Sequence, residues 1–586
     1  MNKRKLLIFA GFSLLATANM LAANNEKGID YFRAELYEAA KIFFLQQTNQ
    51  SKSEKAENYY YLGHTYYQLN QNDSASYYYQ KAIETFPEYP FGYIGEGKME
   101  LKKGNSKVAE ELFKKANNFA KKDPAVQTTI AEVYVDAGDY NNAIIALERA
   151  KKVNSKYSGI YVVEGDMFMK QGKVGEACSR YDNALYFNKS DKVALLKSAK
   201  VYKNVNEKIA LENLNKLIAI DPNYIPAYAV IGDIHYAVGR NQAALDAYEK
   251  FIAIQGVPMA QHESYAQLLY FTGQYDKADE KIKSILAIDP NNLVMKRIEA
   301  YNSFRRENFT LGLEQMNNFM KIMPEERHIY QDYTTLAQLA AKERQTQLAL
   351  EAFQKAIDKD PERATGEKIY LQMAAAAQGA RMFPEAVGFY EKYFENETSP
   401  GIQDFNSYGL ICRSAAMYYI APENIASVTT PEAEAAYEAA LKEFVQKGDK
   451  AYATVIERNP DIYHGYFGRA SIIALLDVYD GAKARKVEGY AKPLFEEALK
   501  IMLENNTDGV RNKEIITAYR YLVSIFYANN DMPSTIEYSK KILQVDPNDE
   551  GAKETLDQLL QYNRKLLQQD PNNEQAKNNL RLLNAR

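Results

Sequence analysis

The stretch YAVIGDIHYAVGRNQAALDAYEKF, residues 228–251, contains two apolar-periodic runs on either side of Val238-Gly239-Arg240. Apolar side chains recur three or four residues apart in each run, which is the spacing of one face of an α-helix. The glycine between the runs favours a turn. The stretch therefore predicts two helices joined by a tight turn.

The same pattern returns at a fixed period on both sides of this stretch. Three columns show the period: Pro222, Gly256, Pro290 and Pro324; Tyr236, Tyr270 and Phe304; and Ala244, Ala278 and Gly312. A fixed period of roughly 20–50 residues is typical of repeat architectures. Each repeat then packs only on its neighbours, so a chain of 586 residues can fold without one large core.

Two further columns contain only alanine over four successive rows. They are Ala75, Ala109, Ala143 and Ala177, and then Ala82, Ala116, Ala150 and Ala184. Small side chains allow two helices to approach closely, because the distance between helix axes depends on the side chains at the contact. Both columns are therefore expected to lie between packed helices.

The row that starts at Ala56 carries a known pattern of large and small residues. Its members are Tyr59, Leu62, Gly63, Tyr66, Ala75, Tyr79, Ala82 and Pro87. This row resembles the tetratricopeptide repeat, a helix–turn–helix unit of about 34 residues. The resemblance implies an all-α fold, a right-handed α-α superhelix of about twelve stacked helix hairpins.

The agreement with the period divides the chain into regions. We expect a signal peptide over residues 1–23, an N-terminal repeat array over 24–397, divergent repeat-like helices over 398–511, and a C-terminal repeat with capping helices over 512–586. The divergent region contains two irregular inserts, at 421–431 and 478–489. Residues 29–47 are expected to form an abbreviated helix pair, because terminal repeats are commonly atypical.

The segment over residues 1–23 has the three parts of a secretory signal. Lys3 to Lys5 form a charged start, Leu6 to Leu15 are a short apolar core, and Ala16–Ala18 or Met20–Ala22 offers a small-residue cleavage site. The apolar core is too short to span a bilayer, and no cysteine follows it, which argues against a lipoprotein. We therefore expect an exported, periplasmic protein with no transmembrane span.

Composition and motifs exclude several classes of function. The net charge is only −4 and no basic stripe stands out, so nucleic acid is not an expected partner. The five histidines are His64, His235, His262, His328 and His464. No two of them have the i, i+4 spacing of a helical metal site, and no glycine-rich phosphate loop is present. We expect no catalytic residue, no metal and no cofactor.

The chain has two cysteines, Cys178 and Cys412, which are far apart in the sequence. An oxidising compartment would permit a disulfide between them. Residues about six repeats apart along a solenoid rarely meet, because each repeat contacts only its neighbours. Two free, buried thiols are therefore favoured over one bridge.

In the tetratricopeptide family the first helices of successive repeats line a concave channel. The resemblance implies that the second, fifth, ninth, twelfth and thirteenth places of each row face it. The candidate partner-binding residues are Tyr60, His64, Tyr67, Tyr236, Tyr270, Arg297, Tyr301 and Phe304. Tyrosine suits this role because it combines a large contact area with one hydrogen bond. The alternative, that the aromatic residues only fill a narrow superhelix, stays open.

These observations favour a non-enzymatic interaction scaffold in the bacterial cell envelope. It would bind a peptide segment or a partner protein in the concave channel. The alternative is that the repeats position a catalytic or carbohydrate-binding site built by residues 398–500. A homo-oligomer formed through the polar C-terminal helices is a lesser alternative.

Overall fold

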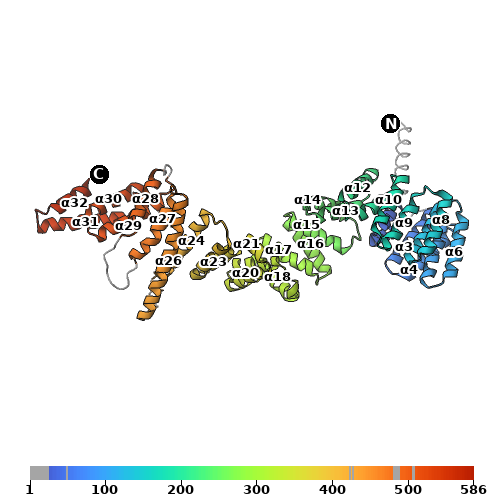
Figure 1. Cartoon of the computed structure of the whole chain (residues 1–586), viewed down its shortest axis with the longest axis horizontal. Coiled ribbons are helices and arrows are strands. Elements are labelled where there is room, and N and C mark those ends of the chain that lie inside the picture. The colour runs from blue at the N-terminus through green and yellow to red at the C-terminus, as the bar shows by residue number, and fades with distance from the viewer. Residues whose placement is uncertain are drawn as a thin grey trace, which may run out of the picture. The chain divides into compact units, whose positions relative to one another are not determined.

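The computed structural model describes residues 25–47, 51–421, 424, 428–478, 489–504 and 509–585. In this part of the chain all regular secondary structure is helical, and Figure 1 shows helices that follow one another in pairs. The predicted all-α fold of stacked helix pairs is therefore confirmed. The predicted signal peptide lies outside the described residues, as do most of the insert at 478–489 and part of the insert at 421–431.

The chain divides into two compact units, Met1–Asn308 and Phe309–Arg586. After a helix over residues 25–33, the first unit contains α2 (Tyr37–Leu45), α3 (Lys52–Gln68), α4 (Asn72–Thr85), α5 (Pro90–Lys102), α6 (Ser106–Phe119), α7 (Pro124–Ala137), α8 (Tyr140–Asn154), α9 (Ser158–Lys170), α10 (Val174–Phe187), α11 (Lys192–Tyr202), α12 (Glu207–Ile220), α13 (Pro226–Ala237), α14 (Asn241–Phe251), α15 (Met259–Phe271), α16 (Tyr275–Ile288) and α17 (Leu293–Arg305). Each odd-numbered helix from α3 to α15 packs against the helix that follows it.

The second unit has the same pairing with longer and less regular helices. It contains α18 (Phe309–Ile322), a 3₁₀ turn (Glu325–Arg327), α19 (Tyr330–Lys342), α20 (Thr346–Lys359), α21 (Pro361–Gly366), α22 (Ile369–Gly379), α23 (Phe383–Asn396), α24 (Ile402–Tyr419), α26 (Pro431–Arg458), α27 (Tyr463–Val478), α28 (Lys492–Glu504), α29 (Asn512–Ala528), α30 (Met532–Val545), α31 (Glu550–Gln569) and α32 (Glu574–Asn584). The start predicted for the divergent region, residue 398, falls between α23 and α24.

Local sequence signals explain where these helices begin and end. Pro124 and Pro226 occupy the first turns of α7 and α13, where a missing N–H does no harm. Asp139 accepts a 3.1 Å hydrogen bond from the Asn142 backbone N–H and so caps α8. Gly239 follows α13 with a φ of +73°, a left-handed conformation that glycine adopts without strain.

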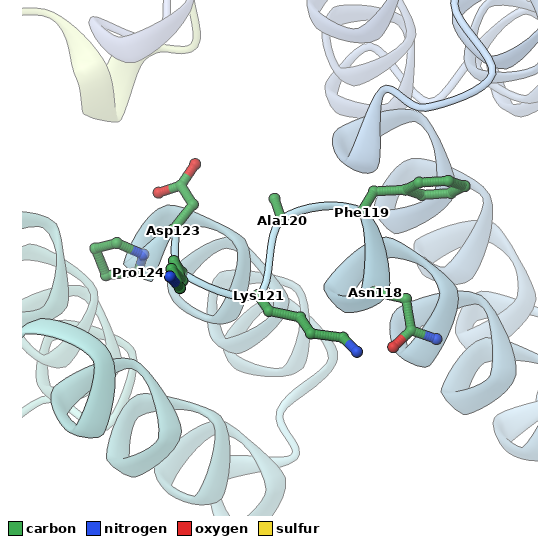
Figure 2. Close-up of a pocket in the computed structure, with 7 residues that line it drawn as sticks. Asn118, Phe119, Ala120, Lys121, Asp123 and Pro124 are labelled. Atoms are coloured by element: carbon green, nitrogen blue, oxygen red, sulfur yellow. The ribbon is translucent and has the colours of Figure 1, made fainter.

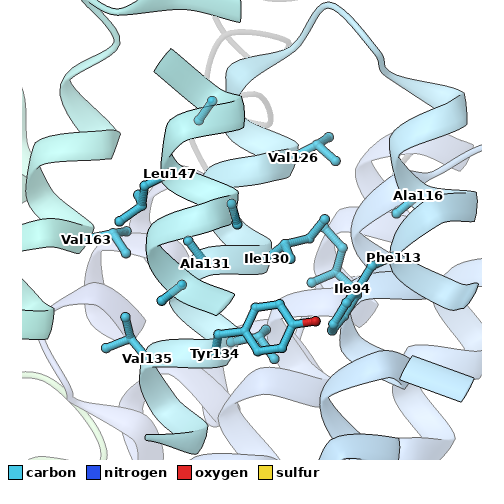
Figure 3. Close-up of a cluster of buried hydrophobic side chains, with 14 of the residues drawn as sticks. Ile94, Phe113, Ala116, Val126, Ile130, Ala131, Tyr134, Val135, Leu147 and Val163 are labelled. Atoms are coloured by element: carbon cyan, nitrogen blue, oxygen red, sulfur yellow. The ribbon is translucent and has the colours of Figure 1, made fainter. Parts of the chain in front are cut away.

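The alanine columns lie between helices, as predicted. Ala75, Ala109, Ala143 and Ala177 are all fully buried, at 0% exposure. Figure 3 shows the core around one such contact, where Ile130 and Tyr134 of α7 lie near Phe113 of α6. Burial of large apolar side chains of this kind stabilises a fold by roughly 1.5–3 kcal/mol each.

Glycines in the odd-numbered helices leave room for aromatic rings of the even-numbered helices. A Cβ atom on Gly63 would lie 2.7 Å from the Tyr79 ring. A Cβ atom on Gly232 would overlap the ring of Tyr248 in the same way. The glycine and the ring have the same separation along the chain in both rows, so this contact repeats with the period of the sequence.

Two further observations concern the cysteines and the membrane. Cys178 and Cys412 are both free and buried, which confirms the prediction of two separate thiols.

Among the described residues, no helix has the length and apolar character that a bilayer crossing requires.

Candidate functional site: the inner face of the odd-numbered helices

The inner face is defined here as the five channel places of each row on the odd-numbered helices of the first unit. Residues at these places from several rows surround one cavity of about 360 Å³. They are Gln68 on α3, Glu132, Val135 and Asp136 on α7, Asp166, Met169 and Lys170 on α9, and Lys200 on α11. The cavity therefore joins side chains from rows far apart in the sequence.

The chain's own N-terminal residues complete this cavity. Phe32, Arg33, Glu35 and Tyr37 line it together with the inner-face residues. The helix pair expected near residues 29–47 is present, as the helix over 25–33 and α2. It does more than cap the array, because its side chains reach α7 and α11.

His64 lies under this N-terminal helix, and Tyr60 lies beside it on α3, 5.7 Å from the Phe91 ring of α5, centroid to centroid. The exposed fractions of Tyr60 and His64 are only 4% and 3%, and the His64 ring is 5.5 Å from that of Phe32, centroid to centroid. His64 Nδ1 and Tyr79 Oη are 2.9 Å apart. Burial lowers the pKa of His64 well below its usual value, with a further contribution from Lys98, so the ring is neutral. In this structure both predicted residues face the chain itself, and their binding of a partner stays a prediction.

Tyr67 belongs to a charged network that was not predicted from the sequence. Lys98 Nζ is 4.2 Å from the Tyr67 ring centroid and donates a 2.7 Å hydrogen bond to Asp136. Lys170 approaches the same carboxylate at 2.8 Å. Burial would raise the pKa of Asp136, but the two lysines outweigh it and lower the pKa to about 2. Lys98, Asp136 and Lys170 all stand at inner-face places, so the position in the row was the signal that could have found them.

The other five predicted residues lie on α13, α15 and α17. Tyr236 Oη donates a 3.0 Å hydrogen bond to Gln267 Oε1 and so connects α13 to α15. The rings of Tyr270 and Tyr301 are 6.3 Å apart, which connects α15 to α17. Tyr301 is buried, whereas Tyr236, Tyr270, Arg297 and Phe304 are half-buried.

The predicted residues therefore form two groups. The first, on α3, is Tyr60, His64 and Tyr67. The second is Tyr236, Tyr270, Arg297, Tyr301 and Phe304, and we call it the aromatic group. Because three successive odd-numbered helices supply the aromatic group, a ligand lying across these helices would meet one aromatic residue after another.

A separate hollow of about 600 Å³ lies beside the linker between α6 and α7. Figure 2 shows that Phe119, Lys121 and Asp123 surround it. Asp123 is already engaged, because it accepts a 2.9 Å hydrogen bond from the Ala125 backbone N–H. The hollow contains none of the residues predicted from the sequence, and we place the candidate site on the inner face.

The region proposed for a catalytic alternative contains a buried thiol, Cys412 on α24. Burial raises the pKa of Cys412 to about 12, although Tyr408 and Lys447 act in the opposite direction. A nucleophilic cysteine requires the reverse shift, because the thiolate is the reactive form. Within the described ranges, no three His, Cys, Asp or Glu side chains are grouped closely enough to hold a metal ion.

Comparison with known families and proteins agrees with the repeat pattern. A family model described as a tetratricopeptide repeat matches residues 56–89. A second model with the same description matches residues 125–157. The first match covers the row that starts at Ala56.

Several known proteins are similar to this chain. The TPR repeat-containing protein MJ1428 of Methanocaldococcus jannaschii is 21% identical over 326 residues, which are 47% of this chain and 57% of that protein. The chain therefore spans little more than half the length of this relative. The solved C-terminal part of a TPR repeat-containing protein from Cytophaga hutchinsonii is 21% identical, with a TM-score of 0.37, over 50% of this chain and 99% of that one.

A tetratricopeptide repeat protein from Parabacteroides merdae is 18% identical, with a TM-score of 0.28, over 40% of this chain and 93% of that one. The fixed period of the sequence, the paired helices and the two matched repeats lead to one conclusion. The chain contains tetratricopeptide repeats at residues 56–89 and 125–157, and its paired helices continue with the same period beyond them.

Proposed function

We propose that this protein is an interaction scaffold of the bacterial cell envelope, which binds a peptide segment or a partner protein on its inner face. The repeat fold itself points to a scaffold for protein partners. The binding of a peptide segment and the location in the cell envelope are finer proposals than the repeat fold alone supports. The location follows from the signal-like residues 1–23.

The observation that carries the proposal is the arrangement of the aromatic group. Tyr236 and Tyr270 are half-buried, so each has a supported ring and an accessible part. The hydrogen bond from Tyr236 to Gln267 and the contact of Tyr270 with Tyr301 fix both rings between neighbouring repeats. Rigid aromatic side chains bind well because little entropy is lost on association.

Photo-crosslinking in living cells tests this proposal. A benzophenone amino acid replaces Tyr270 in one strain and Tyr186 in a control strain. Tyr186 is 76% exposed on α10, an even-numbered helix, and so does not report on the inner face. We expect a discrete crosslinked partner from position 270 in the envelope fraction and none of that mass from position 186.

A variant with Tyr236, Tyr270 and Phe304 changed to Ala should lose this partner. Loss of one aromatic anchor costs on the order of 2 kcal/mol of binding free energy. The matched control changes three exposed tyrosines, Tyr186, Tyr527 and Tyr562, to Ala. Circular dichroism establishes that both variants fold. Equal capture by the two folded variants would exclude the aromatic group as the binding site.

A further inference from the structure

The N-terminal segment, defined as residues 25–45, is held in the first unit by contacts with residues far away in the sequence. Tyr31, Phe32 and Leu36 are buried, with exposed fractions of 4%, 6% and 8%. The Phe32 ring lies 5.7 Å from Tyr61 and 5.5 Å from His64, both on α3. The segment therefore inserts an aromatic residue against the inner face.

An arginine attaches the segment to α7. This helix begins the third row, if the row that starts at Ala56 is counted as the first. Arg33 Nη1 and Glu132 Oε1 are 2.9 Å apart, and the two residues are 99 positions apart in the sequence. Glu132 stands at the ninth place of its row on α7, a place that faces the channel. The Coulomb attraction of Glu132, though opposed by burial, raises the pKa of Arg33 further above its usual value.

Acidic residues attach the segment to the fifth row. Lys192 Nζ, at the start of α11, lies 2.7 Å from Glu26 and 2.9 Å from Asp30. Further along α11, Lys200 Nζ donates a 3.2 Å hydrogen bond to the Ala34 carbonyl oxygen. The segment thus contacts the first, third and fifth rows.

The backbone of α2 also packs closely against the sixth row, at the linker that follows α14. A Cβ atom added to Gly256 would lie 2.7 Å from the Ala39 backbone nitrogen, and Gly256 has a φ of +80°. Only glycine meets both conditions without strain. We call the surface that holds the segment its seat; it is formed by α3, α7, α11 and the residues around Gly256. The seat therefore includes a surface that fits a helix backbone.

The contacts of the N-terminal segment resemble those of a helical ligand bound in a groove. Glu26, Asp30 and Arg33 are at positions i, i+4 and i+7 of one helix, so they lie on the same face. A helix that binds a groove is read by its anchors at this spacing. Partly exposed ion pairs contribute little stability, and the segment borders a cavity of about 360 Å³ along Phe32, Arg33, Glu35 and Tyr37.

We propose that the inner face of α3, α7 and α11 binds an amphipathic helix with two acidic residues, an aromatic residue and an arginine spaced as in residues 26–33. The N-terminal segment is the resident copy of this ligand, and a partner helix of the same chemistry displaces it. The inference rests on the proposed function but concerns a different part of the inner face from the aromatic group.

A fluorescent peptide with the sequence of residues 25–46 tests the proposal by fluorescence anisotropy. The full chain with Phe32→Ala and Arg33→Glu has a weakened resident segment and an unchanged seat. We expect it to bind the peptide about ten-fold more tightly than the wild type. The matched control carries Phe187→Ala and Lys189→Glu on exposed sites, and should bind like the wild type.

A charge exchange tests the register of the bound peptide. In the full chain with Glu132→Arg, the resident Arg33 loses its partner and the seat acquires a positive charge. This chain should prefer the peptide with Arg33→Glu over the wild-type peptide by about ten-fold, and the Phe32→Ala, Arg33→Glu chain should show the opposite preference.

The proposal is overturned if the weakened chain binds the peptide no more tightly than the wild type, or if the charge exchange changes no preference. It is also overturned if both variants lose helical circular dichroism, because the segment would then be an integral part of the fold. Crosslinking at Tyr270 is independent of these results. A partner found there without peptide binding would leave the proposed function and remove only this inference.

Discussion

Tyr248 Oη donates a 2.6 Å hydrogen bond to Asp233 Oδ1, and so joins the second helix of a repeat to an inner-face residue of the first. Tyr181 bonds to Asp166 in the same way at 2.8 Å. In both rows the aromatic residue comes fifteen positions after its partner. Because the ring is buried in the core while its hydroxyl holds the carboxylate, packing between repeats fixes the orientation of the inner-face side chain.

The change Tyr248→Phe removes this bond and keeps the ring. Asp233 is partly exposed and regains water, so we expect a loss of about 1 kcal/mol in the free energy of unfolding. Hydrogen exchange in α13 and α14 should accelerate, since local openings there become easier. The control Tyr186→Phe, at an exposed site, should change neither quantity. Equal exchange in the two variants would contradict a role for the bond.

The change Gly232→Ala tests the close approach of the helices. The added Cβ atom would overlap the Tyr248 ring, which is fully enclosed and cannot move without a shift of α14. Overpacking of this kind costs typically about 1–3 kcal/mol. Gly175→Ala provides the opposite case, because its Cβ atom would meet nothing within 4 Å and alanine favours helix. Urea unfolding should therefore show destabilisation at position 232 and a neutral or stabilising effect at position 175.

The sequence predicted the buried alanine columns because their contacts are local. Ala75 and Ala109 are buried where their columns indicate, and the glycines of the first helices face aromatic rings in row after row. Such contacts depend on residues within one row or the next, so the fixed period carries the information needed to place them. The helix pairing follows from the same pattern.

The sequence did not predict what covers His64. Phe32 covers it, as part of a segment whose other contacts reach Glu132 and Lys192. These contacts cross 99 and 162 positions and belong to no column. A pattern within rows cannot show which rows a non-periodic segment will touch, so the segment beside His64 could not be predicted from the repeat period.

The two thiols should resist alkylation in the folded protein. Cys412 is 0% exposed and Cys178 is 8% exposed. Burial raises the pKa of both thiols, which lowers the fraction of reactive thiolate. Mass spectrometry after a short iodoacetamide pulse should show Cys178 modified before Cys412, and both modified rapidly in urea. Faster modification of Cys412 would contradict the burial order.

The N-terminal segment should be held more tightly in mild acid than at neutral pH. Burial raises the pKa of Asp30 from 3.8 to about 6, although Lys192 acts in the opposite direction, and Glu26 and Asp221 add to the rise. The docked segment therefore binds a proton more strongly than the released one. Docking the segment with Asp30 ionised costs free energy. This cost is absent below about pH 4, grows between about pH 4 and pH 6, and reaches its full value above that range.

A dye on Glu35→Cys measures this effect, since Glu35 is largely exposed and the two native thiols are buried. The free energy of releasing the segment, obtained from urea titrations, should rise as the pH falls from about 7.5 to about 5, by an amount on the order of 1–3 kcal/mol. Asp30→Asn removes the titrating group and should flatten most of this slope. Part of the slope should remain, because burial also raises the pKa of Glu57 on α3. Release that becomes easier in mild acid would show that the ion pairs with Lys192 outweigh the burial of Asp30, and would refute this assignment.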